Sequence, residues 1–188
     1  PLGNTGFDVG LFSLGGQAAL ETPGQEDLSE EIINRALDLG VNYIDTSAYY
    51  GGSNYDKGLS ERNIGRAIAG RRDSVFLATK TLWRDSRRAL QDLNRSLANL
   101  QTDYVDLWQI HNVRTAFDWS VVSRPGAALA AAQQARSEGK VRFIGVSGHY
   151  DPAPIATATE AAGAGPSGKY VAGGYPAVVT RQTTQKNE

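Results

Sequence analysis

Five side chains with complementary chemistry are widely separated along this 188-residue chain. Four apolar segments end in or near Asp45, Lys80, His111 and Ser147, and a phenol, Tyr50, follows the first of these. A cation close to a phenol stabilises the phenolate and lowers the pKa of tyrosine from about 10. A tyrosine tuned in this way is a general acid, which can protonate a carbonyl oxygen near neutral pH.

The apolar run VFLAT predicts that the stem of Lys80 is buried, and a buried ammonium needs a partner. Asp45 is the nearest candidate carboxylate, and it would keep Lys80 charged and aimed. Tyr50 would then protonate a carbonyl oxygen while a hydride arrives at the carbon, and His111 would add a second hydrogen bond to that oxygen. The chain has no redox residue of its own, so the hydride has to come from a cofactor.

These residues belong to a regular alternation of predicted strands and helices. Strands are predicted at 7–16, 41–47, 74–81, 103–111 and 141–149, and helices at 29–40, 59–70, 85–101, 125–140 and from 151, with Ser29, Ser60 and Asp151 as N-caps. Strict alternation predicts an α/β fold with a parallel sheet and right-handed crossovers. In such a sheet the carboxyl ends of neighbouring strands share one edge, so the five side chains could converge there.

Two architectures fit this alternation, a doubly wound sheet and a (β/α)₈ barrel. The first predicted strand–helix turn, SLGGQ, lacks the spacing G-x-G-x-x-G of a dinucleotide fingerprint, which weakens the doubly wound alternative. The pattern alone leaves both open.

The composition argues against several classes of partner and site. A formal net charge of -1 gives no basic field for a nucleic acid. With no Cys and two His, we expect neither a disulfide nor a metal site. No apolar run is long enough for a membrane span, and the cytoplasm is the default location.

Four segments, DTSAYYG, LATK, DYVDLWQIH and GKVRFIGVSG, resemble the aldo-keto reductase family, and PLGNTGFDVGLFSLGG resembles its opening hairpin and first strand. The resemblance implies a (β/α)₈ TIM-barrel fold that reduces aldehydes and ketones with NADP, or less often NAD. By the resemblance Tyr50 is the proton donor, Asp45 and Lys80 tune it, and His111 orients the carbonyl. The cofactor contacts that it implies are Gly15, Gly16, Gln17, Asp45 and Ser147.

The resemblance covers about residues 1–155, and two regions are therefore expected. Residues 1–160 would be an incomplete barrel of about five βα units, and 161–188 a divergent tail rich in Gly, Ala and Thr, in which KYVAGG and PAVVT could be short strands. Five strands cannot close an eight-stranded barrel. We therefore expect a truncated chain: a fragment, a homo-oligomer joined through the open sheet edge, or a chain unstable alone.

The function predicted is an NAD(P)H-dependent oxidoreductase acting on a small-molecule carbonyl or alcohol. A cofactor-binding regulatory subunit and a truncated inactive paralogue on the same scaffold are the alternatives. Five of the site residues also have a simpler interpretation: Asp45 as a loop cap, Tyr50 as rim packing, Lys80 as a solvated strand-end lysine, His111 as a core histidine and Ser147 as a turn residue.

Overall fold

The computed structural model describes residues 2, 5–51, 57–148 and 177–179. Six strands form one parallel sheet, and their order in the sheet is their order along the chain. The strands are β1 (Leu14–Gly15), β2 (Tyr43–Asp45), β3 (Phe76–Thr81), β4 (Val105–Ile110), β5 (Val141–Val146) and β6 (Ala177–Val179). The helices are α1 (Glu26–Asp38), α2 (Leu59–Ala67), α3 (Ser86–Leu100), α4 (Ala116–Val122) and α5 (Ala128–Ser137), with short 3₁₀ turns η1 (Ala18–Glu21) and η2 (Arg72–Ser74).

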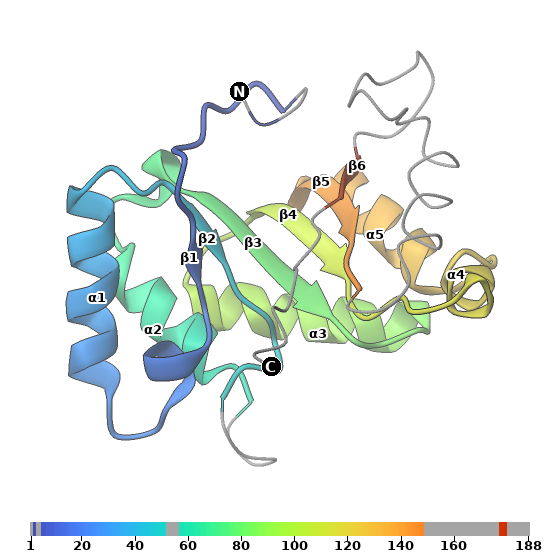
Figure 1. Cartoon of the computed structure of the whole chain (residues 1–188). Helices are drawn as coiled ribbons and strands as arrows, with labels where there is room; N and C mark the ends of the chain where they lie inside the picture. Colours follow the sequence, from blue (N-terminus) through green and yellow to red (C-terminus); the bar gives the residue numbers. More distant parts are fainter. Residues whose placement is uncertain (1, 3–4, 52–56, 149–176, 180–188) are drawn as a thin grey trace, which may run out of the picture.

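The sheet order separates the two architectures that the sequence left open. A doubly wound sheet reverses its strand order at a switch point and carries helices on both faces. Here the order never reverses, and α1, α2, α3 and α5 succeed one another along one side of the curving sheet (Figure 1). The described residues therefore have the arrangement of a (β/α)₈ barrel, as far as their six strands extend.

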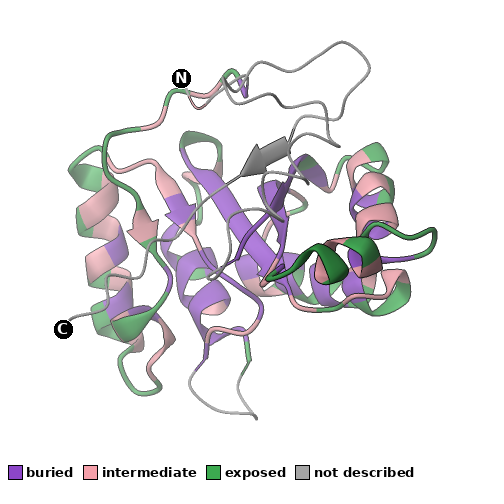
Figure 2. Cartoon of the chain, turned by 45° about the vertical axis from the view of Figure 1, so that its right-hand side comes forward, coloured by how far each residue is buried: buried purple, intermediate pink, exposed green. Residues whose placement is uncertain are grey.

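The helix-facing side of the sheet holds the larger apolar core. Strand residues such as Leu77, Trp108 and Ile144 pack there against helix residues such as Ile33 and Leu93. Leucines of α3, such as Leu93, Leu97 and Leu100, contribute to this core. Figure 2 shows β3, β4 and β5 buried almost throughout, β1 and β2 partly exposed, and the helices exposed on their outer sides.

The opposite face of the sheet is apolar only at the amino ends of its strands. The ring of Phe76 lies 5.4 Å from Phe7, 5.3 Å from Tyr43 and 6.0 Å from Phe143, measured between ring centroids. The segment before β1 supplies Phe7 and so covers this end of the inner face. The polar side chains of this inner face lie at the carboxyl ends of the strands.

Three expectations about the elements were wrong. The strand expected at 7–16 is reduced to Leu14–Gly15, because the Asn42 side chain, and not a strand ladder, binds Gly10 N and Asp8 O, both at 2.8 Å. Ser29 is no N-cap: α1 begins at Glu26, and the buried Ser29 hydroxyl donates to main-chain oxygens at 2.8 Å.

Ser60 is no N-cap either, since α2 begins at Leu59 and the Ser60 hydroxyl is hydrogen-bonded to Thr46 Oγ1 at 2.8 Å. Helix α4 was not predicted, although Thr115 and Asp118 form a capping box at its start. β6 lies within the PAVVT segment, and the helix expected from 151 and the KYVAGG segment lie outside the described residues. No helix in the described part of the chain is long and apolar enough to cross a membrane.

Candidate active site

A polar cluster occupies the inner face at the carboxyl edge of the sheet. Asp45 ends β2, and Lys80 is the second-last residue of β3. Lys80 lies opposite Gln109 in the register of β3 and β4. Because side chains alternate between the faces of a strand, these residues share the face that carries Phe76 further down.

Lys80 and Asp45 are in contact, as the burial of the lysine stem led us to expect. The Lys80 ammonium donates to Asp45 Oδ2 at 2.6 Å and to the main-chain oxygen of Thr46 at 2.8 Å. The side chain of Lys80 is 1% exposed and that of Asp45 is 15% exposed. Burial lowers the pKa of Lys80, while the charge and hydrogen bond of Asp45 act in the opposite direction.

Gln109 is a member of this cluster that the sequence analysis missed. Its Nε2 donates to Asp45 Oδ1 at 3.1 Å, so both carboxylate oxygens of Asp45 are engaged. The signal was present: Gln109 precedes His111 by two positions on a predicted strand, which places both on one face. Its hydrogen bond to Asp45, however, could be assigned only once the register of β3 and β4 was known.

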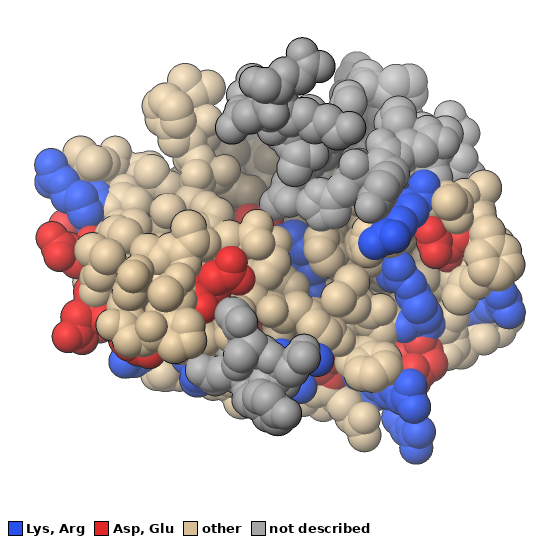
Figure 3. All heavy atoms as spheres, turned by 60° about the horizontal axis from the view of Figure 1, so that its bottom comes forward, with Lys and Arg blue, Asp and Glu red and all other residues tan. Residues whose placement is uncertain are grey.

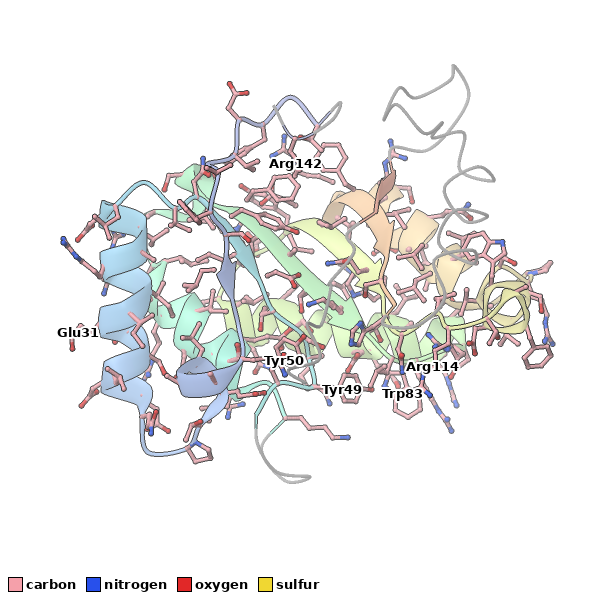
Figure 4. All side chains as sticks on the ribbon, viewed as in Figure 1. Glu31, Tyr49, Tyr50, Trp83, Arg114 and Arg142 are labelled. Carbon is pink, nitrogen blue, oxygen red and sulfur yellow. The ribbon has the colours of Figure 1, made fainter. Side chains whose placement is uncertain are left out.

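Tyr50 lies in the loop that follows β2, above the lysine. The Lys80 Nζ is 5.0 Å from the centroid of the Tyr50 ring, within the range of a cation–π interaction. Main-chain hydrogen bonds fix the loop: Tyr50 N donates to Ser47 O at 3.1 Å, and Ser60 N donates to Tyr50 O at 3.2 Å. Figure 4 shows Tyr50 at the edge where the strands end. The structure thus brings together Asp45, Lys80 and Tyr50.

His111 and Ser147 form a second pair at the same edge, just beyond β4 and β5. The His111 Nδ1 and the Ser147 Oγ are 2.7 Å apart, and Ser147 is buried. A serine hydroxyl that donates to Nδ1 selects the tautomer that carries its hydrogen on Nε2. In that tautomer the imidazole can donate a hydrogen bond to a carbonyl oxygen.

The three residues expected at the first loop lie beside Asp45 but differ in what surrounds them. Gly15 is paired in register with Asp45, and a Cβ on Gly15 would meet no atom of the described residues within 4 Å. Gly16 is packed: its Cβ would lie 2.6 Å from Ser60 Oγ. Gln17 is exposed and precedes η1. As far as the described residues show, the space above Gly15 is therefore open to a flat group, whereas Gly16 is required by packing against α2.

Buried carboxylates support β3 from its helix side. Thr79 Oγ1 donates to Glu61 Oε1 at 2.7 Å, and Thr81 Oγ1 donates to Asp92 Oδ2 at 2.7 Å. Burial raises the pKa of both carboxyl groups. The strand that carries Lys80 is held by hydrogen bonds on the face opposite the cluster.

The sequence profile of the Aldo/keto reductase family matches residues 8–171. L-galactose dehydrogenase of Arabidopsis thaliana is 33% identical over 158 residues, which are 78% of this chain and 47% of that protein. The chain spans about half the length of the curated relatives it matches.

Two solved structures are similar over most of this chain. A thermostable aldo-keto reductase in complex with the inhibitor epalrestat gives a TM-score of 0.69 at 32% identity, covering 85% of this chain and 57% of that one. An aldo/keto reductase from Klebsiella pneumoniae in complex with NADP and acetate gives a TM-score of 0.60 at 28% identity, covering 74% and 46%. These likenesses confirm the expected barrel-type fold. The division of the chain at residue 160 stays a prediction.

Proposed function

The chain belongs to the aldo-keto reductase family, and from that premise we propose that it is an NAD(P)H-dependent oxidoreductase that reduces an aldehyde or ketone to an alcohol. The observation that carries the proposal is the buried ammonium of Lys80, held against Asp45 at 2.6 Å with the Tyr50 ring above it. A buried cation beside a phenol is the arrangement that a tyrosine general acid needs.

In the proposed reaction Tyr50 donates its phenolic proton to the carbonyl oxygen. The negative charge that remains on the phenol is stabilised by Lys80, whose own charge is maintained by Asp45. Gln109 fixes the second oxygen of that carboxylate. When Ser147 donates to His111 Nδ1, His111 carries its hydrogen on Nε2, donates a second hydrogen bond to the carbonyl oxygen and helps to stabilise the charge that develops there.

The residues at this edge fit a nicotinamide cofactor. Ser147 offers a buried hydroxyl, Asp45 a carboxylate, and Gly15 an open backbone on which a flat ring can lie. We assign Gly16 and Gln17 to the same loop against the cofactor. When bound, the cofactor supplies the hydride that adds to the carbonyl carbon. NADP is the proposed form, with NAD as the alternative, and the NADP complex of the Klebsiella relative supports it.

The test is Tyr50→Phe, which removes the proposed proton donor and keeps the ring. We expect the rate of NADPH oxidation with a simple aromatic aldehyde to fall by about 10²–10⁴-fold, while NADPH binding measured by fluorescence stays within about twofold. Tyr104→Phe is the matched control, because Tyr104 lies before β4 at the opposite edge and donates to Asp73. Turnover that survives in Tyr50→Phe would show that the acid is another group.

A further inference from the structure

The rim of the candidate site continues without a break from Tyr50 to the loop after β4. Burial raises the pKa of Tyr49, which precedes Tyr50, to about 12, and the Trp83 side chain in the loop after β3 lies close enough to lower it. Arg84 follows Trp83 and donates to the main-chain oxygens of His111 and Asn112, both at 2.8 Å. These contacts tie the loops after β2, β3 and β4 into one rim.

This rim is rich in guanidinium groups. Arg114 is exposed, and its Nε donates to Asn112 Oδ1 at 2.9 Å. Burial lowers the pKa of Arg84, the nearby charge of Asp118 raises it, and the charge of Arg114 adds a smaller lowering, so both Asp118 and Arg114 lie near Arg84. Arg88 adds a third guanidinium, 4.8 Å above the centroid of the Trp83 ring.

The carboxylates of the same loops are already engaged by their own backbone. Asp118 Oδ2 accepts hydrogen bonds from Arg114 N and Thr115 N, both at 3.0 Å, and these bonds hold the pKa of Asp118 below its usual range. Asp85 Oδ1 caps α3 by accepting from Arg88 N at 2.9 Å, and Asp85 Oδ2 lies 3.8 Å from Arg88 Nε, so this carboxylate also pairs with the Arg88 guanidinium. Both carboxylates serve to shape the loops that present the guanidinium groups.

The pictures show how these groups lie around the site. Along the edge where the strands end, Tyr50, Tyr49, Trp83 and Arg114 follow one another (Figure 4). Figure 3 looks onto this side of the molecule, and the Lys and Arg side chains gather over the part formed by α3 and α4, whereas the far side toward α1 carries most of the Asp and Glu in view.

We propose that the substrate carries a carboxylate on the far side of its reacting carbonyl, and that Arg114, next to Trp83 along this rim, binds it. This inference rests on the proposed function, since it places the carbonyl at Tyr50. The planar fork of a guanidinium matches a carboxylate and can bind it through two parallel hydrogen bonds. Arg84 contributes through its charge, because its guanidinium is committed to His111 and Asn112.

The test compares 4-formylbenzoate with 4-formylbenzamide, which have nearly the same shape and differ by one charge. We expect kcat/KM to favour the benzoate at low ionic strength, and Arg114→Gln to reduce that preference by about three- to tenfold through a higher KM. Arg35→Gln removes the same charge from the exposed face of α1 and should leave the preference unchanged. Salt at about 0.5 M should weaken the preference in the wild type.

A binding measurement separates this inference from the proposed function. The indole N–H resonance of Trp83, assigned with Trp83→Phe, should shift on titration with 4-formylbenzoate but not with the amide, and the shift should be lost in Arg114→Gln. If neither aldehyde is reduced while the benzoate alone shifts Trp83, the proposed function fails and the carboxylate site stands. Equal kcat/KM for both aldehydes, or an unchanged preference in Arg114→Gln, would overturn the carboxylate site and leave the reductase intact.

Discussion

Asp45→Asn would leave the Lys80 ammonium buried without its partner charge. In the wild type the two charged groups are 2.6 Å apart, and the lysine side chain is 1% exposed. Breaking a buried ion pair by removing one partner lowers the free energy of unfolding by about 3–5 kcal/mol. Lys80 can limit this loss by folding without its proton. At pH 7 that costs at most about 4.6 kcal/mol, from a reference pKa of about 10.4 and about 1.36 kcal/mol per pH unit. The two estimates agree.

The pKa of Lys80 sets how the stability loss in Asp45→Asn depends on pH. Burial already lowers the pKa of Lys80, and removing Asp45 removes an influence that raises it, so the pKa is lower still in the variant. A lysine with a lower pKa in the folded state binds fewer protons when folded, and the free energy of unfolding then rises with pH. The deficit of Asp45→Asn is therefore largest near neutral pH. It shrinks by up to about 1.4 kcal/mol per pH unit between the lysine pKa of the variant and that of the wild type.

Urea unfolding followed by circular dichroism at pH 7, 8 and 9 measures this deficit. The matched control is Asp38→Asn, whose ion pair with Arg71 at 3.1 Å joins side chains that are 59% and 37% exposed. The Asp38–Arg71 pair should contribute less than about 1 kcal/mol to the free energy of unfolding. An Asp45→Asn variant no less stable than the control at pH 7 would refute the buried pair. A deficit equal at pH 7 and pH 9 would assign the loss to hydrogen bonds alone.

Three further substitutions test the surroundings of the site. Gly16→Ala would place a Cβ 2.6 Å from Ser60 Oγ and should lower the free energy of unfolding by about 1–3 kcal/mol. Gly15→Ala, whose Cβ would meet no described atom within 4 Å, should change the free energy of unfolding little. Urea unfolding of the two variants measures the difference. Tyr43→Phe removes a buried hydroxyl that has no hydrogen-bond partner among the described residues, and the same measurement should find equal stability or a gain of up to about 1 kcal/mol. Thr115→Ala removes the side-chain cap of α4, so amide hydrogen exchange there should quicken by the equivalent of about 1 kcal/mol.

The sequence was most informative where a strand is long and buried. The apolar runs around β3, β4 and β5 were each bounded by polar or glycine-rich turns, and the structure has a strand within every predicted range. The segment 7–16 was misleading because its apolar residues are interrupted by Asp8, Gly10 and Ser13, and Leu11 and Phe12 prove to be exposed. Helix α4 escaped prediction because it has 7 residues, too few to show a periodic stripe.

Contacts between strands were harder to predict than the strands themselves. The pairing of Asp45 with Lys80 could be inferred, because both residues follow buried runs and few other charges are available. Gln109 could not be assigned to Asp45 in the same way, since its place depends on the register that sets Lys80 beside it. The hydrogen bond between His111 and Ser147 likewise depends on how β5 lies along β4. A single sequence fixes the order of such strands more readily than their offset.

The polar end of β3 explains why its lysine can be kept inside the protein. Three of the six residues of β3 are polar, and Thr79, Lys80 and Thr81 are all almost completely buried. A parallel strand covered on both faces shows no alternation of apolar and polar residues, so its sequence alone does not say which polar group points where. Once Lys80 is assigned to the inner face, both threonines must point to the helices, where each donates to a buried carboxylate, Glu61 or Asp92. Two hydrogen bonds therefore hold β3 on its helix side, and the ion pair with Asp45 holds it on the inner face. A substitution at Glu61 should then shift Lys80, although it replaces no residue of the inner face.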